Sequence, residues 1–208
     1  MSVPLLIAVI VGYLLGSLPF GYLVARAKGV NIFEVGSKNP GATNVRRVLG
    51  HGPGNLVLVL DGLKGAVAAG WPLFATGLPM PAGPLMSVVG LTAALLGHSF
   101  SCFTQFRGGK GVATAAGGFF VLFPLGALTA AATWGLVLVL TRYVSLASML
   151  AGVALTVAAV MGHVAPLILG ASALVMIFVI IRHRSNLSRL LAGTENKVGK
   201  PKSDPAAR

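Results

Sequence analysis

Residues 97–114, GHSFSCFTQFRGGKGVAT, interrupt an apolar chain with a histidine, serines, an arginine and a lysine among glycines. Glycines leave backbone N–H groups unobstructed, and Arg107 and Lys110 lie beside them. The residues after Gly111 can begin a helix, whose first free N–H groups favour an anion. This central polar segment is therefore predicted to hold a phosphate. It is not a Walker A loop, because glycine follows the lysine, and a tight turn between membrane helices would show the same residues.

A second group of polar residues forms the N-terminal polar segment, residues 35–50, with the sequence VGSKNPGATNVRRVLG. The Asn-Pro-Gly sequence at residues 39–41 indicates a turn. The chain after it can start another helix that favours an anion at its first residues. For Arg46 or Arg47 alone, a place on the cytoplasmic side of a membrane is an equally good explanation.

The C-terminal polar segment, residues 182–195, reads RHRSNLSRLLAGTE. Its His183, taken alone, is more typical of a membrane-interface histidine than of a catalytic one. Asp61 and Lys64 lie inside an apolar stretch, at a spacing that lets them pair on one helix face. A charge inside a membrane is costly and usually faces a polar interior. We therefore expect this pair to support the site structurally and not to catalyse.

The composition is that of a membrane protein. Of 208 residues, 55% are hydrophobic and 10% are charged, whereas soluble domains carry roughly 25% charged residues. The net charge of +12 could suggest a nucleic-acid partner. A basic soluble module with interleaved aromatic residues is missing, however, so no nucleic acid is expected and membrane orientation explains the charge better. The first apolar run lacks a basic start and is too long for a signal peptide, which predicts a retained membrane helix.

The apolar stretches predict the membrane helices, each needing roughly 20 residues to cross a bilayer. Seven stretches qualify or nearly qualify: residues 4–24, 56–76, 84–96, 112–123, 124–140, 144–161 and 165–181. The third and fourth are short, so they either tilt or flank a buried irregular loop.

The distribution of Lys and Arg predicts the sidedness. The connections at residues 77–83 and 162–166 contain neither, whereas the other connections and the C-terminal end do. With the N-terminus outside, seven crossings place every basic connection in the cytoplasm. Treating 112–140 as one crossing would send Arg142 outside, so we expect two short helices joined near residues 123–126.

The predicted fold is thus all-α, a polytopic integral membrane protein with about seven transmembrane helices, five being the alternative. The C-terminus would be cytoplasmic. Residues 1–193 would form a single transmembrane domain, and the polar residues 194–208 a disordered cytoplasmic tail. The chain holds only four carboxylates and four isolated histidines, so no metal site is expected. A basic cleft at the membrane surface suits a phosphorylated substrate together with a lipidic one.

Three motifs carry a family resemblance: GSKNPGATNVRR, GHSFSCFTQFRGGKGVAT and RHRSNLSRLLAGTE. They closely resemble the signature regions of the bacterial membrane acyl-phosphate:glycerol-3-phosphate acyltransferases, the PlsY family, and the order and spacing match over nearly the whole chain. The resemblance implies transfer of a fatty acyl group from long-chain acyl-phosphate to the 1-hydroxyl of glycerol 3-phosphate. The products would be lysophosphatidic acid and inorganic phosphate, in the first step of phosphatidic acid synthesis, with no cofactor. No histidine here has an aspartate five residues later, as the His-x4-Asp acyltransferases do.

The same resemblance implies a place in the bacterial cytoplasmic (inner) membrane, with the active site on the cytoplasmic side. It also implies residue roles, with Glu195 mainly structural. The catalytic residues would be Ser37, Arg46, His183 and Asn186. The substrate-binding residues would be Asn39, Asn44, Arg107, Gly108, Gly109, Lys110 and Gly111, the last four at the phosphate of glycerol 3-phosphate.

The chemistry fits these residue types. Two phosphate anions must approach each other, so cations are needed to offset their repulsion, and hydrogen-bond donors would stabilise the oxyanion. His183 and a substrate phosphate are alternative acceptors for the hydroxyl proton. An acyl-Ser37 intermediate is less expected, because acyl-phosphate is already activated. The rival hypotheses are a transporter for an anionic metabolite and, with less support, a lipid-binding scaffold.

Overall fold

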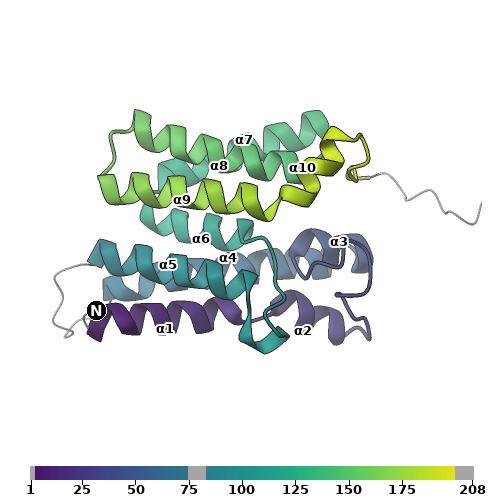
Figure 1. Ribbon diagram of the computed structural model, residues 1–208, viewed down its shortest axis with the longest axis horizontal. Helices are drawn as coiled ribbons and strands as arrows, with labels where there is room; N and C mark the ends of the chain where they lie inside the picture. The colour runs from purple at the N-terminus through teal and green to yellow at the C-terminus, as the bar shows by residue number, and fades with distance from the viewer. Residues whose placement is uncertain (1–2, 75–82, 200–208) are drawn as a thin grey trace, which may run out of the picture.

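The computed structural model describes residues 3–74 and 83–199, and all regular secondary structure in this part of the chain is helical. The elements are α1 (Val3–Ser17), α2 (Phe20–Arg26), α3 (Ala42–Leu49), α4 (His51–Phe74), α5 (Gly83–Ser99), η1 (Cys102–Thr104), α6 (Val112–Leu122), α7 (Pro124–Thr141), α8 (Val144–Met161), α9 (Pro166–Arg182) and α10 (Arg184–Leu191). In Figure 1, α6 lies between a layer formed by α1, α4 and α5 and a layer formed by α7, α8 and α9.

Within the described residues, every predicted apolar stretch forms helix over most of its length, but the first is broken. Residues 75 and 76 of the second stretch lie outside the described residues. α1 ends at Ser17 and α2 begins at Phe20, because Pro19 has no N–H to continue the hydrogen-bond ladder. The predicted turn between the fourth and fifth stretches is confirmed as a break at Phe123, where α6 ends and α7 begins. The third stretch runs on to Ser99 and is followed by an irregular loop, residues 100–111, in which Ser101, Thr104 and Gly109 are buried.

The number of membrane crossings is not fixed by length and composition alone. Five segments are long and apolar enough to span a bilayer: Val3–Arg26, His51–Leu73, Gly83–Thr104, Pro124–Thr141 and Val144–Met161. α9 and α10 qualify as a sixth only when taken together, with a bend of 60° between them. α6 is a shorter apolar helix of 11 residues. Five to six spans are therefore supported, and the seven-crossing arrangement and its orientation stay predictions.

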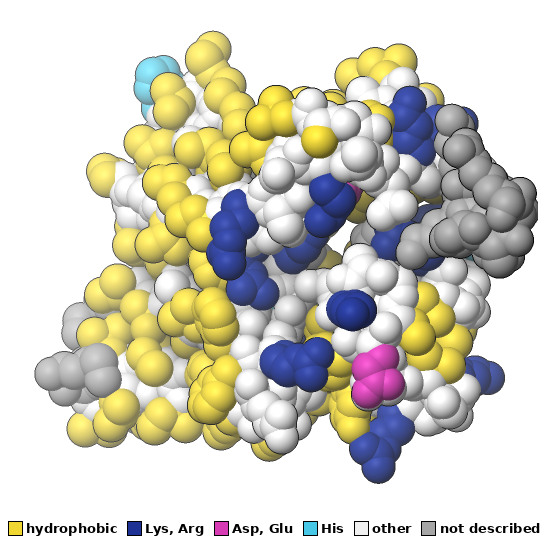
Figure 2. All heavy atoms as spheres, turned by 45° about the vertical axis from the view of Figure 1, so that its right-hand side comes forward, with side chains coloured by type: hydrophobic (Ala, Val, Ile, Leu, Met, Phe, Trp, Pro, Cys, Tyr) yellow, Lys and Arg dark blue, Asp and Glu magenta, His cyan; other side chains and the backbone are white. Residues whose placement is uncertain are grey.

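Small residues bring the helix backbones close together. An added Cβ at Gly12 of α1 would lie 2.3 Å from the carbonyl oxygen of Gly90 on α5, and one at Gly16 would lie 2.0 Å from that of Ala94. Such contacts between small residues are the usual way in which membrane helices associate. On the outer surface, large apolar side chains such as Leu136, Val139 and Leu140 of α7 are exposed. Figure 2 shows a broad apolar surface on the molecule.

The three polar segments lie at one end of the bundle. α2, α3, α10 and the loop of residues 100–111 occupy this end in Figure 1, whereas α1 begins at the other end. The turn at residues 162–165, which has no Lys or Arg, also lies at that other end. The prediction that the polar segments share one side is therefore confirmed.

Candidate functional site

Residues from all three polar segments line one cavity of about 350 Å³, which we call the site cavity. Its polar lining residues are Ser37, Asn39, Thr43, Asn44, Arg47, Lys110, Ser145, Ser148, His183, Asn186, Arg189, Glu195 and Asn196, together with Asp61 and His98. Figure 2 shows Lys and Arg side chains gathered beside a hollow on this face of the molecule. Segments that are far apart in sequence therefore build a single basic site.

Asn44 organises the N-terminal polar segment. Its side chain is buried, and its Oδ1 accepts a hydrogen bond of 2.8 Å from the Ser37 N–H. Its Nδ2 donates to the Val35 carbonyl at 3.1 Å. The amide that was predicted to bind substrate is therefore engaged by the protein. These two hydrogen bonds hold residues 35–37 in place, and Ser37 there lines the site cavity.

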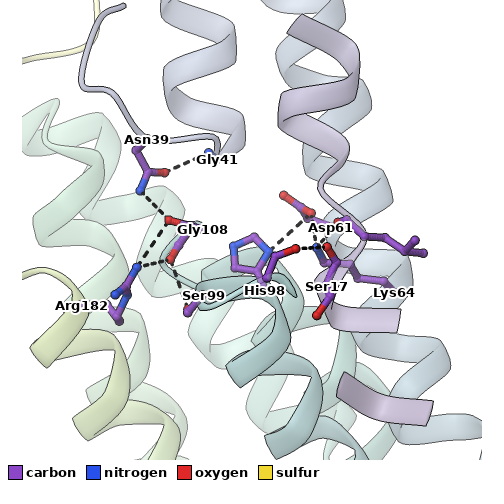
Figure 3. A network of polar contacts seen from close by, with 12 residues as sticks. Ser17, Asn39, Gly41, Asp61, Lys64, His98, Ser99, Gly108 and Arg182 are labelled. Atoms are coloured by element: carbon purple, nitrogen blue, oxygen red, sulfur yellow. Dashed lines mark hydrogen bonds and ion pairs between the residues drawn. The ribbon is translucent and has the colours of Figure 1, made fainter. Parts of the chain in front are cut away.

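Asn39 and Arg182 both bind the loop of residues 100–111, which we call the central loop, and so join the polar segments, as Figure 3 shows. The Asn39 Oδ1 accepts from the Gly41 N–H at 2.9 Å, and its Nδ2 donates to the Gly108 carbonyl at 3.4 Å. From α9, the Arg182 Nη2 donates to the Gly109 carbonyl at 2.8 Å and lies 3.4 Å from that of Gly108. The loop that carries Lys110 is thus held by both neighbouring segments.

Gly108 and Gly109 are not among the residues that line the site cavity, and their predicted contact with a phosphate stays a prediction. The Gly109 N–H donates to the His98 carbonyl at 3.0 Å. A Cβ on Gly109 would lie 2.1 Å from the His98 Nε2, and one on Gly108 would lie 2.1 Å from the His98 carbonyl oxygen. Glycine is needed here because the loop packs directly on the end of α5.

Lys110 and Gly111 do line the site cavity, and their predicted contact with a phosphate stays a prediction. Gly111 has a φ of +82°, a conformation that favours glycine, and it directly precedes α6. The ammonium group of Lys110 donates to the Oδ1 of Asn186. The glycine therefore turns the chain so that the lysine and the first residues of α6 face the same space.

Two cations that were predicted to act in the site lie outside its lining. Arg46 packs against α4, where an added Cβ on Gly54 would lie 2.3 Å from the Arg46 Cβ. The next residue of α3 is turned by about 100°, and Arg47 lines the site cavity. The Arg107 guanidinium lies over the Phe33 ring, 4.4 Å from its centroid, and contacts the Phe33 carbonyl at 3.4 Å. Arg47 is therefore the arginine of α3 that faces the site cavity, and Arg107 supports the N-terminal polar segment. The substrate roles predicted for Arg46 and Arg107 stay predictions.

Glu195 ties the C-terminal polar segment together. Its Oε1 accepts from the Asn186 Nδ2 at 2.6 Å and from the Ser145 Oγ at 2.8 Å. Its Oε2 accepts from the Arg189 Nε at 2.7 Å. Since Asn186 also receives the Lys110 ammonium, a chain of hydrogen bonds connects the central loop to α8 and α10.

The backbone beyond Glu195 is also held. The Val198 N–H donates to the Arg142 carbonyl at 2.9 Å, and the Arg142 Nε donates to the Val198 carbonyl at 2.9 Å. These contacts hold the chain at Val198, and the disordered tail from residue 194 stays a prediction. Residues 200–208 lie outside the described residues.

The polar end of the site cavity favours an anion. α3 and α6 both begin at its wall, at Ala42 and Val112, and a helix N-terminus carries a partial positive charge. Burial lowers the pKa of Lys110 to about 8, aided by Arg189, Arg182 and Arg47 and opposed by Glu195. The lysine is therefore still mostly charged at neutral pH. Glu195 is the main opposing charge, and its hydrogen bonds to Asn186, Arg189 and Ser145 keep its pKa below the ordinary value despite burial.

His183 follows the last residue of α9 and is almost fully buried. Its Nδ1 lies 2.8 Å from the Val179 carbonyl oxygen, so this nitrogen carries the proton of the neutral ring and Nε2 has the free lone pair. Burial, followed by the nearby charge of Lys110, lowers the pKa of His183 to about 4. The imidazole is therefore neutral at physiological pH.

Beyond the polar end, the site cavity continues as an apolar arm between α6, α7, α8 and α9. On α7, small residues spaced along one face make room for this arm, and Trp134 lies farther along the same face. The apolar lining residues include Ala115, Ala116, Phe119, Ala127, Ala130, Ala131, Trp134, Ala151, Leu155 and Val175. The cavity can thus hold a charged group at one end and a hydrocarbon chain at the other.

The match to known proteins agrees with this architecture. A family model described as glycerol-3-phosphate acyltransferase matches residues 6–193. The chain belongs to the glycerol-3-phosphate acyltransferase family. It is 43% identical over 205 residues to a glycerol-3-phosphate acyltransferase of Rippkaea orientalis, covering 95% of this chain and 94% of that one. A second glycerol-3-phosphate acyltransferase, from Geobacter sulfurreducens, is 44% identical over 192 residues, with 92% and 96% covered.

Solved structures of this acyltransferase family share the fold. The crystal structure of PlsY, an integral membrane glycerol 3-phosphate acyltransferase, in its glycerol 3-phosphate form has a TM-score of 0.87 at 39% identity. That comparison covers 94% of this chain and 96% of the other. The lysophosphatidic acid form of PlsY gives a TM-score of 0.84 at 38% identity, covering 94% and 95%. The chain is therefore a multi-pass membrane acyltransferase with the PlsY fold.

Sequence reasoning about this acyltransferase missed Arg47 and Arg189 as residues of the cavity lining and Arg182 as a support of the loop, and it gave no role to His98. For Arg189 a signal existed, because Asn186 and Arg189 are three residues apart on one helix and share a face. The position of α3 against α4, which separates Arg46 from Arg47, has no comparable signal in the sequence. The apolar arm of the site cavity could not be predicted either, because alanines that line a cavity and alanines that pack between membrane helices look the same in the sequence.

Proposed function

We propose that the protein transfers a fatty acyl group from acyl-phosphate to the 1-hydroxyl of glycerol 3-phosphate, releasing lysophosphatidic acid and inorganic phosphate. The observation that carries this proposal is the continuity of the site cavity, whose basic end opens into an apolar arm. An acyl-phosphate has the same two parts, a fatty chain and a phosphate. Membership of the glycerol-3-phosphate acyltransferase family supplies the acceptor.

In this proposal Lys110, Arg47 and the first residues of α3 and α6 bind the substrate phosphates. The acceptor hydroxyl oxygen attacks the acyl carbonyl carbon, and the bond between that carbon and the phosphate oxygen breaks. Ser37 lines the polar end of the site cavity with its hydroxyl available to donate to the oxyanion. Inorganic phosphate leaves readily, so no covalent acyl-Ser37 step is required.

We further propose that a substrate phosphate, and not His183, accepts the hydroxyl proton. A phosphate monoester has a second pKa of about 6, whereas burial lowers the pKa of His183 to about 4. The phosphate is thus the stronger base at neutral pH. His183, with Nδ1 fixed on the Val179 carbonyl, keeps Nε2 as a hydrogen-bond acceptor that can orient a substrate hydroxyl.

The donor assay tests this function. Purified protein in detergent, given long-chain acyl-phosphate and glycerol 3-phosphate, is expected to form lysophosphatidic acid without added metal or nucleotide, whereas acyl-CoA is expected to give none. A chelator should leave the rate unchanged. Turnover with acyl-CoA alone, or activity restored only by a divalent metal, would contradict the donor assignment. Absence of product with either donor, together with uptake of glycerol 3-phosphate into proteoliposomes, would favour a transporter.

We also propose that the basic end faces the cytoplasm of a bacterial inner membrane, because Lys and Arg gather there. Exposed positions are available for labelling intact cells with an impermeant thiol reagent. Native Cys102, and Lys38→Cys or Ser188→Cys in a Cys102→Ser background, are expected to resist the reagent. His163→Cys in the opposite turn serves as the control that should react. Reaction at the first three sites with protection at residue 163 would reverse the orientation.

A further inference from the structure

Asp61 of α4 and His98 of α5 lie close together beside Gly108, as Figure 3 shows. The His98 Nδ1 lies 3.6 Å from the Asp61 Oδ1, which is an electrostatic contact and too long for a hydrogen bond. Their side chains are 9% and 4% exposed. Lys64 completes the cluster, with its Nζ 2.9 Å from the Asp61 Oδ1 and donating to the Leu18 carbonyl at 2.9 Å.

The cluster touches the loop that carries Lys110. Gly109 donates its N–H to the His98 carbonyl at 3.0 Å, and the neighbouring Ser99 hydroxyl donates to the Gly109 carbonyl at 3.2 Å. The His98 ring lies on the side of Gly109 where a Cβ would point, with Nε2 nearest. Asp61 and His98 line both the site cavity and a smaller cavity of about 20 Å³, which Gly108 and Gly109 also line. They therefore form part of the wall on which the loop rests.

We propose that Asp61 and His98 are positioning residues that fix the backbone at Gly108 and Gly109 and thereby place the Lys110 ammonium group in the site cavity. The two ring nitrogens of His98 face Asp61 and Gly109, so the ring acts on the loop and not on a substrate hydroxyl. Asp61, itself held by Lys64, sets the orientation of the ring. A displacement of about 1 Å in such a support can cost about a hundredfold in rate.

The inference rests on the proposed role of Lys110 in binding a substrate phosphate. Its test is a double-mutant cycle between His98 and Lys110, with Asp61→Asn and the milder His98→Gln as further variants. His98→Ala is expected to raise the KM for the same substrate as Lys110→Ala does, by about tenfold, and to leave the KM of the other substrate nearly unchanged. The double variant should be no worse than Lys110→Ala, within about twofold.

Two controls separate this from a general loss of structure. Thr92→Ala lies on the same helix as His98, and its hydroxyl bonds only within that helix, to the Val88 carbonyl at 2.8 Å. It should behave as wild type. The thermal shift produced by glycerol 3-phosphate measures binding without turnover and should shrink in both His98 variants, more in His98→Ala than in His98→Gln.

Multiplicative effects of His98→Ala and Lys110→Ala would overturn the inference, as would a fall in kcat with both KM values intact. A wild-type protein that binds glycerol 3-phosphate but does not acylate it would refute the proposed function alone, because the thermal-shift cycle would still test the positioning role. If Lys110→Ala has no effect on either substrate, the proposed role of Lys110 fails, and the positioning inference fails with it.

Discussion

Lys110→Ala is expected to raise the KM for glycerol 3-phosphate by roughly ten- to a hundredfold. The change removes a charge-assisted contact to a phosphate, worth about 1.5–3 kcal/mol, and each 1.4 kcal/mol is about a factor of ten. It also leaves the Asn186 Oδ1 without the ammonium group that now binds it. Steady-state kinetics with each substrate varied in turn would measure the effect. The KM for acyl-phosphate should change little.

The pKa of Lys110 is expected to set the alkaline limb of the pH profile of kcat/KM. Burial lowers its pKa to about 8, so the charge is present below this pH and is lost as the pH rises through it. The wild-type kcat/KM for glycerol 3-phosphate, which reports the free enzyme, is therefore expected to fall above about pH 8. Lys110→Arg should move this limb to higher pH, because arginine stays charged, and Lys110→Ala should abolish it.

A reversed pattern would change the substrate assignment. If Lys110→Ala inserts and folds normally, keeps its KM for glycerol 3-phosphate and loses affinity for acyl-phosphate, then Lys110 binds the phosphate of the donor. A wild-type KM for both substrates would remove Lys110 from the site altogether.

Gly109→Ala is expected to lower kcat/KM by about a hundredfold or more, and the reason is packing. The new Cβ would lie 2.1 Å from the His98 Nε2, so either the ring or the loop must move. Overpacking of this kind costs about 1–3 kcal/mol, and the displaced loop carries Lys110 away from its position. Initial rates together with the thermal unfolding midpoint would show both effects.

Gly135→Ala provides the matched control, since nothing lies within 4 Å of the added Cβ on α7. It should keep full activity and gain up to about 1 kcal/mol of stability from its higher helix propensity. Near-normal activity in Gly109→Ala would contradict the close packing between the loop and His98.

The helices and their common polar end could be predicted from apolar stretches, from the basic connections and from the glycines at residues 41 and 111. These features are local, so the sequence carries them directly. The choice between Arg46 and Arg47 could not be predicted, because it depends on which face of α3 packs against Gly54.

The packing of Gly109 against His98 could not be predicted for a related reason. A glycine that approaches a phosphate and one that approaches a histidine ring are identical in sequence, and only the contact with His98 separates them. The Asp61–His98 contact joins residues from different helices, so it cannot be predicted from the spacing of residues within a motif.

The position of Glu195 has a consequence for how the enzyme is made. Asn186, Arg189 and Ser145 all bind a carboxylate that lies beyond the last helix, close to the C-terminal end of the chain. Translation proceeds from the N-terminus and earlier parts fold first, so the membrane helices can be inserted before this carboxylate leaves the ribosome. A chain that stops at Gly193 would contain all of those helices and still lack the group that aligns Asn186 with Lys110. Premature termination before codon 195 would therefore yield membrane-inserted protein with an unassembled active site.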